Sequence, residues 1–122
     1  MKMDFTRKGR FVAGGHMTEA PTSLTYSSVV SRDSVKIAFL IAALNDIDIL
    51  ACDIGNAYLN VECREKIWFE AGPECGELRG KPCKLVRALY GLKSSGAAWR
   101  AMFSHFIQED LKFTSTRIDP DV

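Results

Sequence analysis

A carboxylate, Asp53, stands near the end of an apolar run over residues 47–54, and the aromatic residue Tyr58 follows five positions later. A Gly-Asn pair between them is a turn signal. A carboxylate at a strand end can bind a divalent metal ion, because hard cations prefer oxygen ligands. An aromatic ring just beyond the turn can form one wall of the adjoining pocket. The spacing indicates metal-assisted chemistry, although a capping or turn role for Asp53 also explains the residue.

The element that must position Asp53 is a strand, which we predict over residues 47–54. Alternation along a strand places Asp53 on one face with three apolar residues: Ile47, Ile49 and Ala51. An unpaired carboxylate in line with an apolar face is costly. Asp53 therefore needs a metal ion, a cation or an opening to solvent.

Two helices are predicted on either side of this strand. Ser31 and Asp33 are good N-caps for a helix that runs to about Asn45. Its apolar residues cover nearly every face, which predicts burial on several sides. The serine pair 94–95 starts a second helix, which runs to about residue 111. Its apolar stripe predicts a core surface made of Ala98, Trp99, Met102, Phe103, Phe106 and Ile107.

Short extended segments and turns make up the rest of the chain. We expect a hairpin or paired strands over residues 5–17, a strand over 66–70 and a glycine- and proline-rich loop over 71–82. Residues 84–92 fit either a strand or a short helix. The last residues are polar and bring no closing element, so the chain looks like a piece of a larger domain.

The composition is that of an ordinary globular chain. Its 122 residues suffice for one domain or part of one, and 47% are hydrophobic and 25% charged. No apolar run approaches the roughly 20 residues that a membrane helix needs. The four cysteines are irregularly spaced, which disfavours a zinc site and predicts reduced thiols.

Charge is distributed unevenly along the chain. The formal net charge of +1 argues against a simple non-specific nucleic-acid binder. Acidic residues dominate positions 46–77, whereas positions 78–108 carry basic residues and no acid. This segregation is compatible with a polyanion held around a metal site, and equally with solvated charged faces.

Five short motifs follow one another along the chain. Residues 7–15 read Arg-Lys-Gly-Arg-Phe-Val-Ala-Gly-Gly, residues 26–30 read Tyr-Ser-Ser-Val-Val, and residues 52–60 read Cys-Asp-Ile-Gly-Asn-Ala-Tyr-Leu-Asn. Residues 89–95 read Leu-Tyr-Gly-Leu-Lys-Ser-Ser, with Ala-Trp at 98–99, and an Asp-Pro pair stands at 119–120. In this order the motifs resemble those of copia-type LTR retrotransposon reverse transcriptases, along almost the whole chain.

The resemblance implies an α+β fold that comprises the fingers and part of the palm of a right-hand polymerase. Residues 1–46 would be fingers-like, and residues 47–122 palm-like with mixed fingers elements, the Asp-Pro tail being similar to a palm strand. The implied activity is RNA-directed DNA synthesis, in which two Mg²⁺ ions lower the charge on the attacking and leaving oxygens. Asp53 would bind both ions, and the backbone carbonyl of Ile54 would assist.

The same resemblance assigns a nucleotide site. Tyr58 would stack under the sugar of the incoming nucleotide and exclude a 2′-hydroxyl, with Ala57 beside it. Arginine suits phosphate recognition because its planar fork matches phosphate oxygens, so Arg10, together with Lys8, would pair with the triphosphate. The pocket would also be lined by Tyr90 and Gly91, and Lys93 would lie close to the template backbone.

Departures from the family pattern bear on activity. Gly14 replaces the usual lysine, the pair 96–97 is Gly-Ala where the family has Pro-Arg, and no Tyr-x-Asp-Asp box occurs in these 122 residues. Since one carboxylate holds two ions poorly, we expect the chain alone to be inactive. It is either a fragment of a working enzyme or a relic or domesticated module that binds nucleic acid or protein.

The partners and location implied by the resemblance complete these expectations. Template-primer, dNTP and the rest of a Pol polyprotein would be the partners, the last comprising the remaining palm, the thumb, RNase H and integrase. The location would be an intracellular virus-like particle or the nucleus, without a membrane.

Overall fold

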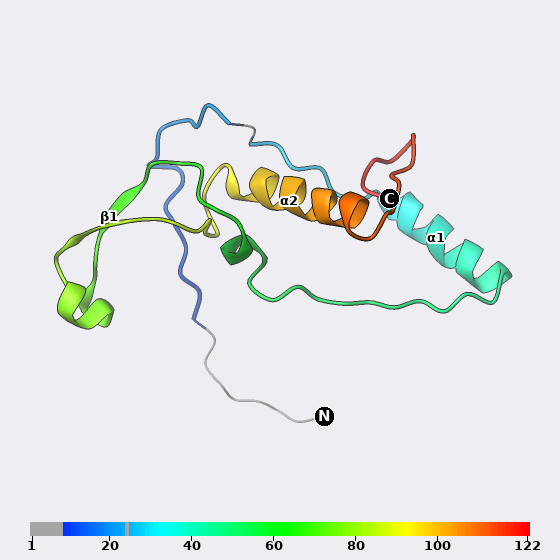
Figure 1. Cartoon of the computed structure of the whole chain (residues 1–122), viewed down its shortest axis with the longest axis horizontal. Helices are drawn as coiled ribbons and strands as arrows, with labels where there is room; N and C mark the ends of the chain where they lie inside the picture. The colour runs from blue at the N-terminus through cyan, green and yellow to red at the C-terminus, as the bar shows by residue number, and fades with distance from the viewer. Residues whose placement is uncertain (1–8, 24) are drawn as a thin grey trace, which may run out of the picture.

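The computed structural model describes residues 9–23 and 25–122 and combines helices with one small sheet (Figure 1). In chain order the elements are α1 Arg32–Leu44, η1 Ala57–Asn60, β1 Trp68–Glu70, η2 Pro73–Leu78, β2 Pro82–Lys84 and α2 Ser95–Glu109, where η marks a 3-10 helix. This mixture agrees with an α+β class. The accessible surface is 10641 Å², against about 6,600 Å² for a compact monomer of this mass. The chain is therefore extended.

Helix α1 begins and ends where the sequence predicts. The side chain of Ser31 accepts a hydrogen bond from the N–H of Ser34 at 3.0 Å, which is the bond that an N-cap makes. The predicted burial is wrong, because Ala42 is the one buried residue of the helix. Leu40 and Ile41 are more than half exposed. Among the described elements, no helix or strand packs against α1.

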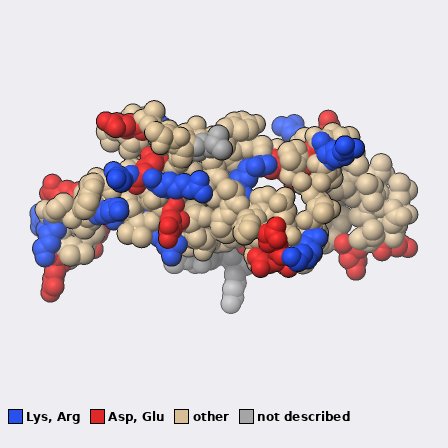
Figure 2. All heavy atoms as spheres, turned by 45° about the horizontal axis from the view of Figure 1, so that its top comes forward, with Lys and Arg blue, Asp and Glu red and all other residues tan. Residues whose placement is uncertain are grey.

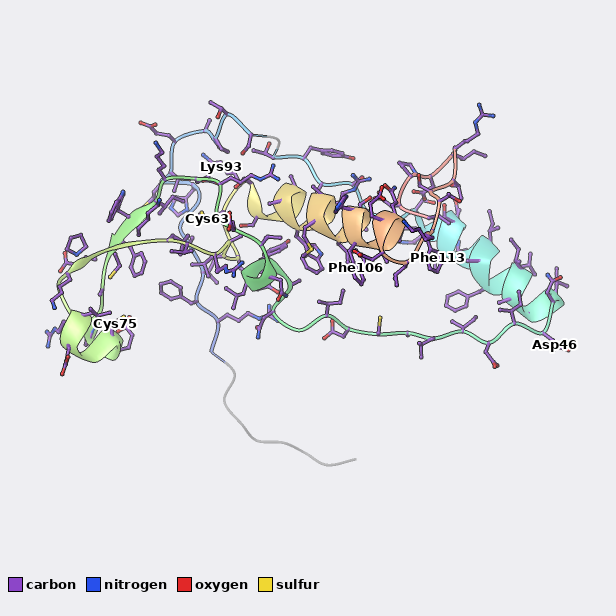
Figure 3. The ribbon with its side chains drawn as sticks, viewed as in Figure 1. Asp46, Cys63, Cys75, Lys93, Phe106 and Phe113 are labelled. Carbon is purple, nitrogen blue, oxygen red and sulfur yellow. The ribbon has the colours of Figure 1, made fainter. Side chains whose placement is uncertain are left out.

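The strand predicted over residues 47–54 does not form. The segment is extended and exposed, and it runs between α1 and η1 away from the other elements (Figure 1). Its side chains project from the ribbon on both sides beyond Asp46 (Figure 3). Apart from a bond from the Ile47 N–H to the Ala42 carbonyl, no backbone hydrogen bond from 47–54 to another described residue is present. A strand needs a neighbour to pair with, and alternation alone does not supply one.

Strands β1 and β2 form an antiparallel ribbon in which Trp68 lies opposite Lys84. This confirms the core of the strand predicted over 66–70. The loop predicted over 71–82 contains η2, which connects the two strands. Pairing continues beyond the ribbon, from Leu85 to Ile67 and from Ala88 to Val61, so residues 84–88 are extended rather than helical, and a turn with Gly91 at φ +91° follows.

The described part of the predicted hairpin over residues 5–17 adopts a different arrangement. Val12 forms a parallel bridge with Tyr90, and the N–H of Ala13 donates to the Tyr90 carbonyl at 2.8 Å. Residues 1–8 lie outside the described part. A distant segment thus takes the place of the expected local partner.

A small core lies where α2 meets η1. It consists of Val61, Ala88 and Ala98, with Tyr58 and Trp99 packed against it. The apolar stripe predicted on α2 is therefore core at its N-terminal end only. Towards the C-terminus Phe106 is 44% exposed, and Phe113 beyond the helix is 64% exposed.

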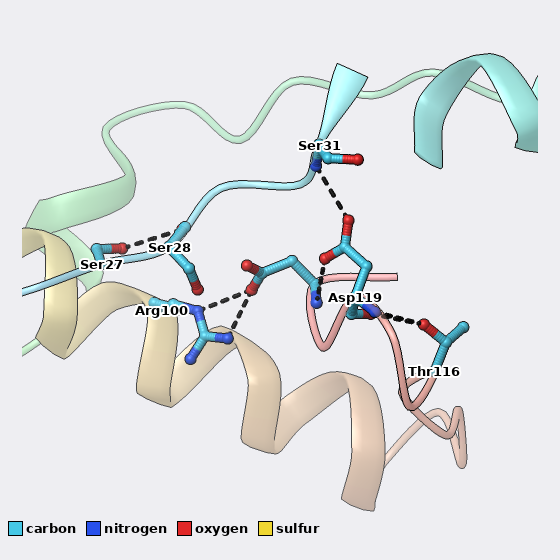
Figure 4. A network of polar contacts seen from close by, with 7 residues as sticks. Ser27, Ser28, Ser31, Arg100, Thr116 and Asp119 are labelled. Carbon is cyan, nitrogen blue, oxygen red and sulfur yellow. Dashed lines mark hydrogen bonds and ion pairs between the residues drawn. The ribbon is translucent and has the colours of Figure 1, made fainter. Parts of the chain in front are cut away.

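The C-terminal segment folds back onto both helices (Figure 4). Asp119 accepts hydrogen bonds from the Ser34 hydroxyl at 2.6 Å and from the Ser31 N–H at 3.0 Å, and these bonds hold the pKa of its carboxyl below the usual value. Asp121 forms an ion pair with Arg100 on α2 at 2.7 Å. The tail is therefore a turn that joins α1 to α2, and the expected strand-like tail is wrong.

Charged side chains of both signs are spread along the whole face shown in Figure 2. Acidic and basic residues that are segregated along the sequence are thus intermixed on this face. The four cysteines are free, and Figure 3 shows Cys63 beside the start of α2 and Cys75 in η2. In the described part of the chain, no helix is long and apolar enough to cross a membrane.

Candidate functional site

Three of the predicted site residues meet at the ring of Tyr90. The guanidinium of Arg10 lies over this ring, 5.6 Å from its centroid. The ring of Tyr58, which belongs to η1, also contacts the Tyr90 ring, with the two centroids 4.6 Å apart and the planes at 45°. Tyr90 is 36% exposed and Arg10 is exposed, whereas Tyr58 is half-buried. The arrangement is an open aromatic corner that carries a cation.

The turn after Tyr90 depends on glycine. Gly91 has φ +91°, a backbone conformation that side-chain-bearing residues rarely adopt. A Cβ at this position would overlap the carbonyl oxygen of Ala13 and approach the Val12 side chain to 2.9 Å. This close approach lets the segment that carries Arg10 lie along the turn that carries Tyr90.

Tyr58 is positioned by the 3-10 helix η1. Asn56 adopts a left-handed conformation with φ 52°, which agrees with the predicted Gly-Asn turn, and the N–H of Leu59 then bonds to its carbonyl at 2.8 Å. Ala57 is half-buried directly before Tyr58. The Tyr58 hydroxyl lies 3.7 Å from the place that a Cβ on Gly96 would occupy. The start of α2 therefore faces this ring closely.

Lys93, another of the predicted basic residues, makes a different contact. The Nζ of Lys93 donates to the backbone carbonyl of Thr18 at 2.8 Å, so this ammonium ties a loop to the turn before α2. Lys8 lies outside the described residues. Of the two predicted cations that the structure describes, Arg10 is the one brought to the aromatic pair.

Asp53 and Ile54 are not brought to the aromatic corner by any contact that the structure shows. Both are exposed on the unpaired segment 47–54, and no hydrogen bond or ion pair joins the Asp53 carboxylate to another described residue. No group of three or more His, Cys, Asp and Glu side chains within the described ranges is arranged to hold a metal ion. A lone carboxylate supplies too few protein oxygens to hold two Mg²⁺ ions, each of which demands octahedral coordination. The described residues therefore do not fit a two-metal centre.

Three polar residues near the site were not predicted as functional. Ser94 and Ser95 are almost fully buried, at 3% and 1% exposure, and Glu65 accepts hydrogen bonds from Ser94. The serines could be read as a helix start from sequence. The role of Glu65 could not be predicted, because Glu65 and Ser94 are 29 positions apart and nothing in the sequence indicates that they meet.

Comparison with known proteins identifies the class. Residues 1–120 match the family described as "Reverse transcriptase (RNA-dependent DNA polymerase)", and the chain belongs to this family. Two relatives from Saccharomyces cerevisiae are similar to it. The Transposon Ty1-NL2 Gag-Pol polyprotein is 31% identical over 118 residues, 95% of this chain, and the Ty1-DR4 Gag-Pol polyprotein is 34% identical over 111 residues, 88% of this chain.

These relatives confirm the resemblance to copia-type retrotransposon reverse transcriptases. The chain spans about 7% of the length of the two polyproteins. No solved structure matches the chain.

Proposed function

We propose that this chain is the nucleotide-binding part of the RNA-directed DNA polymerase of a copia-type retrotransposon. One observation carries the proposal. Arg10, Tyr58 and Tyr90 come from three separate segments and converge on one open corner, at 5.6 Å and 4.6 Å from the Tyr90 ring. An exposed cation beside exposed aromatic surface suits a ligand that combines phosphates with a ring system.

Each residue of the corner has a role in this proposal. Arg10 pairs with the triphosphate, because its guanidinium rests on a ring face and forms no ion pair with a described acidic residue. Tyr58, with Ala57 beside it, supports the sugar and excludes a 2′-hydroxyl. Tyr90 and Gly91 line the pocket. Lys93 is proposed to lie near the template backbone while it braces the loop at Thr18.

In this proposal Asp53 is one of several ligands of a catalytic magnesium site. Its carboxylate, with the Ile54 carbonyl, would contribute oxygen atoms to a magnesium site whose other carboxylates lie outside this chain. Magnesium, when bound, would lower the charge on the reacting oxygens. We therefore propose that residues 1–46 act as fingers and residues 47–122 as palm with mixed fingers elements, and that the chain alone is inactive.

The partners follow from the same proposal. Template-primer and dNTP would be the ligands, and the other parts of a Pol polyprotein would complete the palm, thumb, RNase H and integrase. A virus-like particle or the nucleus is the proposed place of action.

The test is nucleotide binding by the 122-residue chain. We expect dATP to bind more tightly than deoxyadenosine, because the triphosphate adds its pairing with Arg10. Arg10→Ala should remove most of this difference, whereas Arg117→Ala, which changes an exposed arginine on the C-terminal segment, should leave it intact. Equal affinity for dATP and deoxyadenosine in the wild-type chain would refute the proposal.

A second function, nucleic-acid or protein binding without catalysis, is favoured because Asp53 belongs to no group of three or more potential metal ligands among the described residues. The two functions differ in what Asp53→Asn changes when the chain is placed in a complete polymerase. Loss of DNA synthesis with unchanged stability supports catalysis. An unchanged product yield supports the binding role.

A further inference from the structure

The start of α2 is held by a carboxylate from a distant part of the chain. Ser94 occupies the N-cap position, but its side chain makes no capping hydrogen bond. Its N–H donates instead to Oε1 of Glu65 at 3.1 Å, and its hydroxyl donates to the same oxygen. A carboxylate satisfies donors that a helix start leaves unpaired, and its charge is favourable at this end of the helix.

A second contact closes the same turn from inside. The hydroxyl of Ser95, which is 1% exposed, donates to the carbonyl of Leu89 at 2.7 Å. The turn over residues 89–95 is thus held by two contacts, one from Ser95 to the Leu89 carbonyl and one from Ser94 to Glu65. Tyr90 lies within this turn, so its ring position depends on both contacts.

Glu65 also belongs to the segment that continues from Tyr58. Residues 61–67 follow η1 directly and pair with residues 85–88, through bonds such as that from the Cys63 N–H to the Val86 carbonyl at 2.8 Å. Glu65 therefore connects the segment that carries Tyr58 to the turn that carries Tyr90. No other side-chain hydrogen bond in the described part of the chain joins these two segments.

We infer that Glu65 is a positioning residue that sets the spacing of the Tyr58 and Tyr90 rings by anchoring Ser94. The inference rests on the proposed nucleotide site and deepens it. Glu65 does not touch the ligand in this arrangement, since it acts through Ser94. Without its carboxylate, two buried donors of Ser94 lose their acceptor, and burying unpaired donors is costly. The turn then shifts and the aromatic pair opens.

The first measurement needs no ligand. In the wild-type chain, nuclear Overhauser contacts between the Tyr58 and Tyr90 rings report their 4.6 Å separation. Glu65→Ala should abolish them. Glu65→Gln should retain them, because its amide oxygen still accepts both bonds, and Glu62→Ala is the matched control on the same segment. The Trp99–Phe103 contact within α2, at 5.3 Å, should persist in every variant and shows that the helix is formed.

The second measurement is affinity for dATP. Glu65→Ala should weaken binding about tenfold, the factor that corresponds to one buried hydrogen bond, and Glu65→Gln should change it less than about twofold. Unchanged ring contacts in Glu65→Ala would overturn the inference. If that variant also loses the Trp99–Phe103 contact, Ser94→Ala decides, because it removes only the hydroxyl donor.

The outcomes separate the inference from the proposed function. Retained ring contacts in Ser94→Ala would overturn the positioning role, and weakened contacts support it. If the wild-type chain binds no dATP while Glu65→Ala still loses the ring contacts, the nucleotide function fails and the positioning role stands. If the ring contacts are lost but dATP affinity is unchanged, the positioning role stands and the aromatic pair is not the nucleotide site. If the ring contacts are retained in Glu65→Ala while the wild-type chain binds dATP through Arg10, the inference fails and the function remains.

Discussion

Replacing Gly91 with alanine should open the aromatic corner. Two costs add. The left-handed backbone at φ +91° costs an alanine about 1–2 kcal/mol. The new methyl group would overlap the Ala13 carbonyl, so the segment must move and lose its bond from Ala13 to Tyr90, which costs about 1 kcal/mol. The expected total is about 2–3 kcal/mol.

Amide hydrogen exchange measures this cost locally. The Ala13 N–H should exchange about 30- to 150-fold faster in Gly91→Ala, since each 1.36 kcal/mol is a factor of ten. Two glycines separate the contributions. Gly76→Ala introduces the strain of φ +56° with nothing within 4 Å, and Gly55→Ala introduces neither strain nor contact. Amides next to residue 76 should exchange modestly faster in Gly76→Ala, and amides next to residue 55 should exchange at the wild-type rate in Gly55→Ala.

The refuting result is specific. If the Ala13 amide exchanges at the wild-type rate in Gly91→Ala, the close approach of the two segments does not hold Arg10 beside Tyr90. The geometric basis of the proposed nucleotide site would then be lost. An equal effect of Gly55→Ala would show that the exchange reports general loosening and not this contact.

Three further predictions concern the C-terminal turn and catalysis. The pKa of Asp119 is lowered, first by the Ser34 hydroxyl and then by the Ser31 N–H. The contribution of this carboxylate to stability is therefore present above the unfolded value of 3.8 and lost as pH falls through the lower folded pKa. Exchange of the Ser31 amide between pH 5 and 2 should show this loss, and Asp119→Asn should abolish the pH dependence. Arg100→Ala should release the turn and speed tryptic cleavage after Arg117 about fivefold, whereas Lys112→Ala, with its 4.0 Å exposed ion pair, should not. The isolated chain should extend no primer with Mg²⁺, and measurable incorporation would contradict this expectation.

Local features of this protein could be predicted from sequence. Ser31 was identified as a helix start and bonds the Ser34 amide, and the end of α1 followed from the neighbouring polar residues. The motif order indicated the reverse transcriptase family, which the comparisons confirm. Such features depend on residues within a few positions of one another, and capping and turn chemistry act over that distance.

Features that depend on distant residues were decided by tertiary structure alone. Residues 47–54 have the alternation of a strand but lack a paired neighbour, so the strand was predicted wrongly. Two contacts join segments far apart in sequence: Arg10 lies over the ring of Tyr90, and Ser94 donates hydrogen bonds to Glu65. Composition and spacing determined which residues could act, whereas hydrogen bonds and packing between separate segments determined which of them meet, because these form only when the chain has brought their partners together.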